Sequence, residues 1–155
     1  MNERFESTPL SRREMMAAVG VIGLLGAGIR LAAAEAKLID EALAKVLGAK
    51  APQEGRITLD LPEIAENGNT VPLKLSVESP MTADDYVKTV HVFADANPLP
   101  EIASFHFTPR SGKAFAATRM RLAKTQNVVA VAQMSDGSLY MASKEVKVTI
   151  GGCGG

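Results

Sequence analysis

Cysteine, tryptophan and the other aromatic residues are scarce in this sequence. Its 155 residues include one cysteine and no tryptophan, and only 5% are aromatic. A single cysteine cannot form a disulfide within the chain, so the fold must depend on its hydrophobic core. Because 46% of the residues are hydrophobic, there is enough apolar material for one domain of ordinary size. The sequence therefore predicts one domain that folds without covalent cross-links.

An excess of either charge is also lacking. The chain contains 17 lysine and arginine residues and 17 aspartate and glutamate residues. Proteins that bind nucleic acids neutralise phosphates with an excess of basic residues, commonly clustered on one surface. The sequence shows neither the excess nor a cluster of basic and aromatic residues. We therefore expect no nucleic-acid partner.

The residue patterns of a self-sufficient active site are missing as well. The sequence has no arrangement typical of a catalytic triad, no phosphate-binding glycine loop and no cluster with metal-ligand spacing. The only histidines, His91 and His106, lie in predicted strands with no carboxylate or second cysteine at a ligand-like spacing. They are interpreted as structural or surface residues rather than metal ligands or general bases. We expect no enzyme activity, no metal site and no cofactor of the chain's own.

Two pairs of charged residues are candidate functional sites. Asp84 and Asp85 could form a paired-carboxylate site, but with Thr82 just ahead of them they are interpreted as a turn or a strand-entry cap. Arg119 and Arg121 alternate along one predicted strand and so share a face. That face is interpreted as solvated, with a contact surface as the alternative.

Residues 1–34 have the organisation of an export signal. The pair Arg12 and Arg13 precedes a moderately apolar run, rich in glycine and alanine, at residues 19–29, and three alanines follow at 32–34. Paired arginines directly before such a run resemble a twin-arginine signal. The pattern predicts export by the twin-arginine route, which carries proteins across the membrane already folded.

The apolar run leaves two alternatives open. A membrane anchor needs about 20 predominantly apolar residues, and the run from Gly20 to Ile29 is too short unless the flanking alanines are counted. A Sec signal is the other alternative, since Met15, Met16 and Ala17 replace the usual Phe, Leu and Lys of the twin-arginine pattern. The arginine pair and the glycine-rich rather than leucine-rich core favour the twin-arginine route, and we expect no stable membrane anchor.

The cleavage site is expected after Ala34, with Ala36 as the alternative. The mature protein would then be nearly neutral and lie in the bacterial periplasm. That compartment is oxidising, so an unpaired cysteine there requires an explanation.

Residues 35–150 predict one helix followed by strands. Glu35–Leu47 has apolar residues at helical spacing, and Gly48 can end the helix. After the breaks at residues 51–55, turn residues separate about seven candidate strands. These strands are Arg56–Leu61, Val71–Glu78, Val87–Ala94, Ile102–Thr108, Ala116–Lys124, Val128–Met134 and Leu139–Ile150. The pattern predicts an all-β fold, an immunoglobulin-like antiparallel β-sandwich without the Cys-Trp-Cys core of antibody domains.

The chain ends in a glycine arm, residues 151–155, directly after the last predicted strand. In that strand Val146, Val148 and Ile150 alternate with polar residues, so Ile150 is expected to anchor the arm in the core. Glycine has unusual backbone freedom, and three extended residues would let the cysteine sweep roughly 10 Å at about 3.3 Å per residue. A thin, flexible arm is therefore predicted, with four glycines: Gly151, Gly152, Gly154 and Gly155.

Cys153 is the candidate functional residue of this arm. Two residues from the end and flanked by glycine, it has few neighbours to bury it, and only two residues follow it, which excludes a prenylation box. A thiolate can hold sulfur as a persulfide or an S-thiosulfonate. We interpret Cys153 as a covalent attachment point for sulfur. A partner enzyme must activate its thiol, since Lys147 is the only cation in the last nine residues.

Two other functions remain open at this point. The chain could be an exported binding or structural module whose Cys153 only forms intermolecular disulfides. It could instead be a ubiquitin-like carrier that uses the carboxylate after Gly154 and Gly155 as a thiocarboxylate. Export disfavours the second alternative, because that chemistry requires adenylation by ATP.

The chain resembles the SoxY family, the sulfur carriers of the bacterial thiosulfate-oxidising Sox system. The resemblance includes the Gly-Gly-Cys-Gly-Gly ending, the export signal and segments throughout the mature chain. These segments are Glu41–Leu43, Asn97–Pro98, Ala103–Phe105, Thr118–Ala123, Thr125–Val131, Met134–Gly137 and Lys144–Ile150.

This resemblance implies an immunoglobulin-like sandwich that pairs with a second sandwich protein, SoxZ, as a heterodimer. It implies that a c-type cytochrome, SoxAX, conjugates thiosulfate oxidatively to Cys153. A dimanganese hydrolase, SoxB, would remove the terminal sulfonate as sulfate, and the dehydrogenase SoxCD, where present, would oxidise the remaining sulfane sulfur. The haem, manganese and molybdenum belong to these partners, so the chain would carry only its covalently bound substrate.

Overall fold

The computed structural model describes residues 39–152. The expected export signal, with Arg12, Arg13 and both candidate cleavage sites, lies outside the described residues, as do Cys153, Gly154 and Gly155. Within the described part, no helix is long and apolar enough to cross a membrane.

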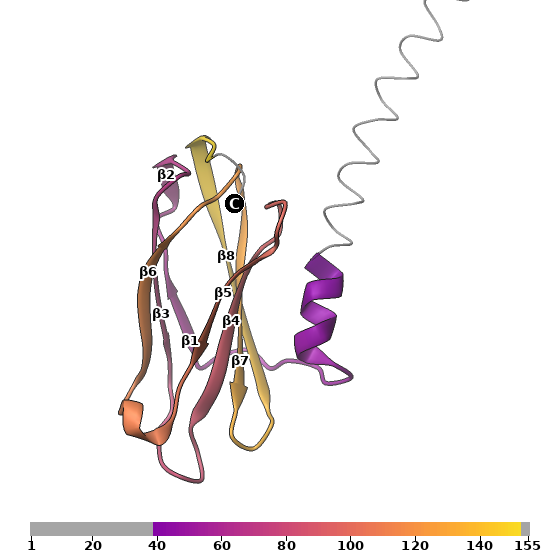
Figure 1. The fold of residues 1–155 in the computed structure, drawn as a ribbon, viewed down its shortest axis with the longest axis vertical. Coiled ribbons are helices and arrows are strands. Elements are labelled where there is room, and N and C mark those ends of the chain that lie inside the picture. Colours follow the sequence, from indigo (N-terminus) through magenta and orange to yellow (C-terminus); the bar gives the residue numbers. More distant parts are fainter. Residues whose placement is uncertain (1–38, 153–155) are drawn as a thin grey trace, which may run out of the picture. The chain divides into compact units, whose positions relative to one another are not determined.

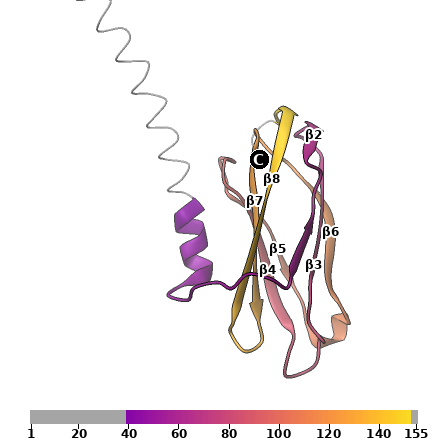
Figure 2. The same cartoon turned by 180° about the vertical axis from the view of Figure 1, so that it is seen from behind.

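Two β-sheets pack face to face (Figures 1 and 2). The smaller sheet has the order β1-β3-β6, with β1 at Ile57–Asp60, β3 at Val71–Val77 and β6 at Ala114–Met120. The larger sheet has the order β2-β8-β7-β4-β5. Its strands are β2 (Ile64–Asn67), β8 (Leu139–Ile150), β7 (Gln126–Met134), β4 (Val87–Ala94) and β5 (Glu101–His106). A 3₁₀ turn, η1 (Pro109–Ser111), leads into β6.

The core lies between the sheets because apolar residues alternate along the strands. In β3, every second residue is buried, and its exposed neighbours include Pro72 and Lys74. Successive strand residues point to opposite faces, so this pattern places one face of the sheet inward. The inward residues include Leu73, Leu75, Val90, Val92, Val128, Ala130 and Val146. The predicted immunoglobulin-like sandwich is confirmed.

The strand pairing differs from the predicted pattern at one edge. All seven candidate strands are present, but an eighth, β2, pairs in parallel with β8, so the larger sheet is not wholly antiparallel. The four residues of β2 contain one buried side chain, Ala65. So short an edge strand shows no alternation that sequence analysis could detect.

β6 ends at Met120, four residues before the predicted end, because the following backbone is held by a side chain. The Asn97 amide nitrogen donates to the carbonyl of Arg121 at 2.9 Å, and the amide of Ala123 donates to Asn97 Oδ1 at 2.9 Å. These bonds replace the pairing that a longer strand would need. Arg119 and Arg121 therefore do not lie on one strand face, contrary to the sequence prediction.

The predicted helix is observed at residues 39–47, the described part of the expected Glu35–Leu47 segment. It covers the outer face of the larger sheet, where Ile39 packs with Phe93, Val129 and Val131. Its end is set by Gly48, whose φ of +58° favours glycine and whose amide donates to the carbonyl of Ala44.

Candidate functional site

The end of β8 is held by its backbone rather than by the side chain of Ile150. Val146 is fully buried and Val148 packs against the core, as their alternation predicts. The side chain of Ile150, however, is 66% exposed. The prediction that Ile150 anchors the arm in the core is wrong, because exposure on this face increases toward the end of β8, from the buried Val146 to the half-buried Val148 and the exposed Ile150.

Three backbone hydrogen bonds link the last residues of β8 to two other segments. The Gly68 amide donates to the Ile150 carbonyl at 2.8 Å, and the Leu122 amide donates to the Gly68 carbonyl at 2.8 Å. The Gly152 amide then donates to the Leu122 carbonyl at 2.9 Å. We call these four residues, Gly68, Leu122, Ile150 and Gly152, the arm-base junction. Its three bonds connect the carbonyl of Ile150, through Gly68 and Leu122, to the amide of Gly152.

The junction requires glycine because the backbones approach too closely for a side chain. A Cβ on Gly151 would lie 2.2 Å from the Ala123 carbonyl oxygen, and one on Gly152 would lie 2.8 Å from the Gly68 carbonyl oxygen. Both are contacts with backbone atoms, which cannot rotate away. Close packing therefore accounts for glycine at these two positions.

This packing differs from what was expected of Gly151 and Gly152. They were predicted to belong to a free, flexible arm, but in the structure Gly152 is buried and hydrogen-bonded. The remaining arm residues, 153–155, lie outside the described residues, and their flexibility stays a prediction. The last backbone group that the structure shows bound to the sandwich is thus one residue before Cys153.

A buried amide pair holds the segment on which Gly151 and Gly152 rest. Asn97 is 4% exposed, and besides its two bonds to residues 121 and 123 its Oδ1 accepts from Gln126 Nε2 at 2.9 Å. Gln126 Oε1 in turn accepts from the Ala96 amide at 2.8 Å. Between residues 39 and 152, every buried side-chain nitrogen or oxygen has a partner. Unpaired polar groups in such a place would be costly, so the pair fixes residues 121–126 firmly.

β8 is also joined to this segment directly. The amide of Val148 donates to Thr125 Oγ1 at 2.9 Å, two residues before the end of the strand. Val148, before the end of β8, is therefore bound to Thr125, and Gly152, after its end, is bound to Leu122. The position from which the arm leaves the sandwich is therefore well defined.

The two histidines lie on the outer face of the larger sheet, away from the core. His91 Nδ1 is 2.8 Å from Ser104 Oγ and 3.4 Å from Glu101 Oε1, and the Ser104 hydroxyl donates to Glu101 Oε1 at 2.8 Å. His106 Nδ1 is 3.1 Å from Thr89 Oγ1. Glu101 is not recognisable from the sequence as a neighbour of His91, because the antiparallel pairing of β4 and β5 brings together residues ten positions apart.

This arrangement is a surface hydrogen-bond cluster. The bond from Ser104, followed by the bond and charge of His91, lowers the pKa of Glu101 below its ordinary value. Since the Ser104 proton points to Glu101, the bond between His91 and Ser104 requires a proton on His91 Nδ1. No group of three His, Cys, Asp or Glu side chains in the described part of the chain could hold a metal ion.

The acidic pair forms a turn, as interpreted from the sequence. The Asp85 amide donates to Thr82 Oγ1 at 3.1 Å, and the Thr82 amide donates to the Asp85 carbonyl at 2.9 Å. Ser135 Oγ donates to the Asp84 carbonyl at 2.9 Å. These bonds use backbone groups, so the pair caps the entry to β4.

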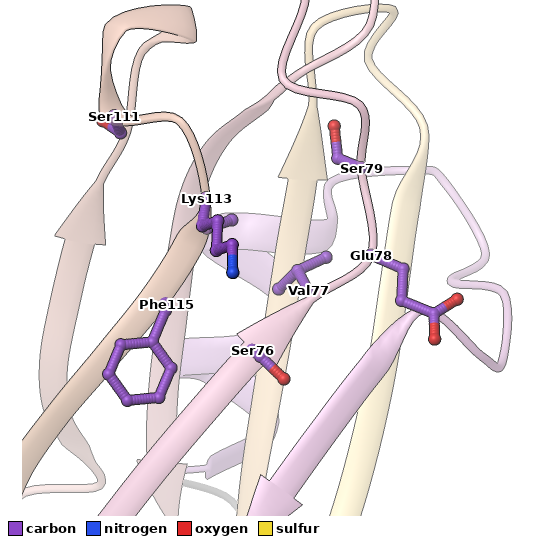
Figure 3. Close-up of a pocket in the computed structure, with 8 residues that line it drawn as sticks. Ser76, Val77, Glu78, Ser79, Ser111, Lys113 and Phe115 are labelled. Carbon is purple, nitrogen blue, oxygen red and sulfur yellow. The ribbon is translucent and has the colours of Figure 1, made fainter.

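A cavity of about 640 Å³ opens at the opposite end of the sandwich from the arm-base junction. Figure 3 shows side chains that line it, from the end of β3 and the start of β6. They are Ser76, Val77, Glu78, Ser79, Ser111, Lys113, Ala114 and Phe115. η1 and the C-terminal end of β8 lie at opposite ends of the fold (Figure 1), so this cavity is not part of the arm site.

The fold and the arm base define a class: an immunoglobulin-like β-sandwich whose last strand leads into a glycine-flanked cysteine. The family model for the sulfur oxidation protein SoxY matches residues 43–153. The chain therefore belongs to the SoxY family of sulfur carriers. The structure of the sulfur carrier protein SoxY from Chlorobium limicola f thiosulfatophilum is 41% identical, with a TM-score of 0.62, and the match covers 74% of this chain and 99% of that chain.

More distant structures share the fold alone. A superoxide reductase (neelaredoxin) from Ignicoccus hospitalis has 18% identity and a TM-score of 0.54, over 61% of this chain and 80% of that chain. A putative superoxide reductase from Thermotoga maritima has 16% identity and a TM-score of 0.54, over 63% and 93%. No curated protein matched the sequence.

Proposed function

We propose that this protein is a covalent sulfur carrier of periplasmic thiosulfate oxidation and that Cys153 is its attachment point. The observation that carries the proposal is the position of this cysteine. It is the only one in the chain, the last residue that the SoxY family model matches, and the first residue after the arm-base junction. A thiol so placed directly follows Gly152, whose amide is bound to the sandwich.

The chemistry of loading needs only this thiol from the carrier. Cys153 loses its proton, a new S–S bond forms to the sulfane sulfur of thiosulfate, and an electron pair passes to a c-type cytochrome, SoxAX. The product is an S-thiosulfonate on Cys153. Thiolates are good sulfur nucleophiles and accept such adducts reversibly, which a serine hydroxyl in the same place would not.

Unloading then uses water and a second partner. The hydrolase SoxB adds water across the bond between the outer sulfur and the sulfane sulfur, sulfate leaves, and a persulfide remains on Cys153. SoxCD, where present, oxidises that sulfur further. The cofactors of these steps belong to the partners, and the carrier contributes the bound substrate.

Tethering explains why a carrier suits this reaction sequence. A substrate held on a chain end is presented at a local effective concentration and need not be recaptured by diffusion at each enzyme. We propose SoxZ as the stable partner in a heterodimer, and export through the Arg12 and Arg13 signal as the route to the periplasm. Because the twin-arginine route carries folded proteins, the heterodimer could cross as one unit.

The direct test replaces Cys153 with serine in the full chain. Cys153→Ser should leave the circular dichroism spectrum and assembly with SoxZ unchanged, while thiosulfate-dependent reduction of SoxAX falls to the background level without carrier. Unchanged turnover in this variant would refute the proposal. The matched control Ser143→Ala, at an exposed position of β8, should keep full turnover.

A further inference from the structure

Gly68 takes part in the arm-base junction although it lies more than eighty residues before the arm. Its amide bonds the carbonyl of Ile150 and its carbonyl accepts from Leu122, which in turn accepts from Gly152. It is the central residue of the arm-base junction, since it donates one of the three hydrogen bonds and accepts another. Gly68 is also buried.

A side chain at position 68 would separate the three backbones. A Cβ there would lie 2.3 Å from the Leu122 carbonyl oxygen and 2.6 Å from the Gly152 nitrogen. The two atoms are the acceptor and the donor of the bond that holds Gly152. Even one methyl group at Gly68 would therefore disrupt the hydrogen bond between Gly152 and Leu122, the bond nearest to Cys153 in the sequence.

The junction determines how much of the arm is free. With Gly152 bound, the tether of Cys153 begins one residue away, a reach of about 3.8 Å between Cα atoms. If the junction opens, the tether begins at Ile150 and roughly 10 Å become available at about 3.3 Å per residue. A closed junction therefore corresponds to a short tether and an open junction to a long one.

We propose that Gly68 is a positioning residue for the carrier thiol: by keeping the arm-base junction closed, it fixes Gly152, the residue before Cys153, at the end of the sandwich where β2 and β8 terminate. A partner active site then receives the thiol only by docking against this end. The inference rests on the proposed function for its biological meaning, because it assumes that Cys153 carries the substrate. The short tether itself is a physical property that can be measured without substrate.

The unique cysteine allows a direct measurement of the tether. A nitroxide spin label on Cys153 of the full chain should give a spectrum of restricted motion in the wild type. Gly68→Ala should add a fast component, and hydrogen exchange at the Gly152 amide should become faster, because an amide loses protection when its bond breaks. An unrestricted wild-type label with rapid exchange at Gly152 would overturn the proposal, as would identical spectra in the two proteins.

Gly112→Ala is the matched control. Gly112 has a φ of +70°, where alanine is strained, but a Cβ there meets nothing within 4 Å. It should lower the melting temperature without changing the label spectrum. Should Gly68→Ala fail to fold, Gly152→Ala tests the same junction from the other side, where a Cβ would lie 2.8 Å from the Gly68 carbonyl oxygen.

The kinetic readout separates positioning from a structural defect. A thiol on a longer tether is presented to a docked partner at a lower effective concentration. Loading of the folded Gly68→Ala carrier by SoxAX should therefore show a lower kcat with KM unchanged, and unchanged kcat would contradict the proposal. Loss of loading in Cys153→Ser, by contrast, tests the proposed function alone.

Discussion

The backbone amide of Gly152 donates a 2.9 Å hydrogen bond to the carbonyl of Leu122, one residue before the only cysteine of the chain. This bond joins the end of the last strand to a loop that follows β6. The loop is itself held by the buried side chains of Asn97 and Gln126. The residue before the proposed site of sulfur attachment is thus supported by contacts that begin in the loop between β4 and β5.

Replacement of Asn97 by alanine should destabilise the whole fold. Asn97→Ala leaves the Arg121 carbonyl, the Ala123 amide and one Gln126 donor without their partners. Unsatisfied buried polar groups cost about 1–3 kcal/mol, and we expect a decrease in the free energy of unfolding of this size in urea denaturation. The control is Asn127→Ala, which removes only an exposed side-chain hydrogen bond to Asp95 Oδ2. Equal losses in the two variants would contradict the role of Asn97.

Removal of the Ser104 hydroxyl should raise the pKa of Glu101. The hydrogen bond from Ser104 is the largest cause of the lowered pKa of this carboxyl, followed by the bond to His91. A group with a lowered folded-state pKa stabilises the fold above its unfolded pKa, and that stabilisation is lost as the pH falls through the folded pKa. In Ser104→Ala the loss should occur at higher pH.

NMR titration of the Glu101 side chain checks this directly. The Glu101 pKa in Ser104→Ala should lie closer to its ordinary value than in the wild type, while Ser143→Ala should leave it unchanged. A Glu101 pKa that does not move would show that the 2.8 Å bond from Ser104 does not control this carboxyl.

Removal of the last residue distinguishes two kinds of carrier. A ubiquitin-like carrier reacts through its terminal carboxylate, so deletion of Gly155 would abolish its activity. A thiol carrier reacts through Cys153, and deletion of Gly155 should leave most of the sulfur loading intact. Loading by SoxAX, followed by intact mass, measures the difference, and complete loss of loading would favour the thiocarboxylate mechanism.

The sequence predicted the strands that alternate and the helix with an apolar face, because these patterns are local. It missed β2, whose pairing with β8 depends on residues about eighty positions away. It also predicted a buried Ile150, because periodicity cannot show where the covering side chains end.

The arm-base junction could not be predicted for the same reason. Gly68 stands in an Asn-Gly-Asn turn, where glycine is common without further cause, and nothing local connects it with Leu122 or Gly152. Glycines at the end of a chain suggest freedom, yet two of these four are required by close backbone contact. The pairing of His91 with Glu101 likewise depends on the register of β4 and β5.

Whether Cys153 carries sulfur can be read from the intact mass of the full chain after incubation with thiosulfate and oxidised SoxAX. We expect a mass increase of one thiosulfate unit, located on Cys153 by peptide mapping and absent from Cys153→Ser. Subsequent treatment with SoxB should leave a persulfide on the same residue. Disulfide-linked dimers as the only product under all conditions would show that Cys153 is not a sulfur carrier.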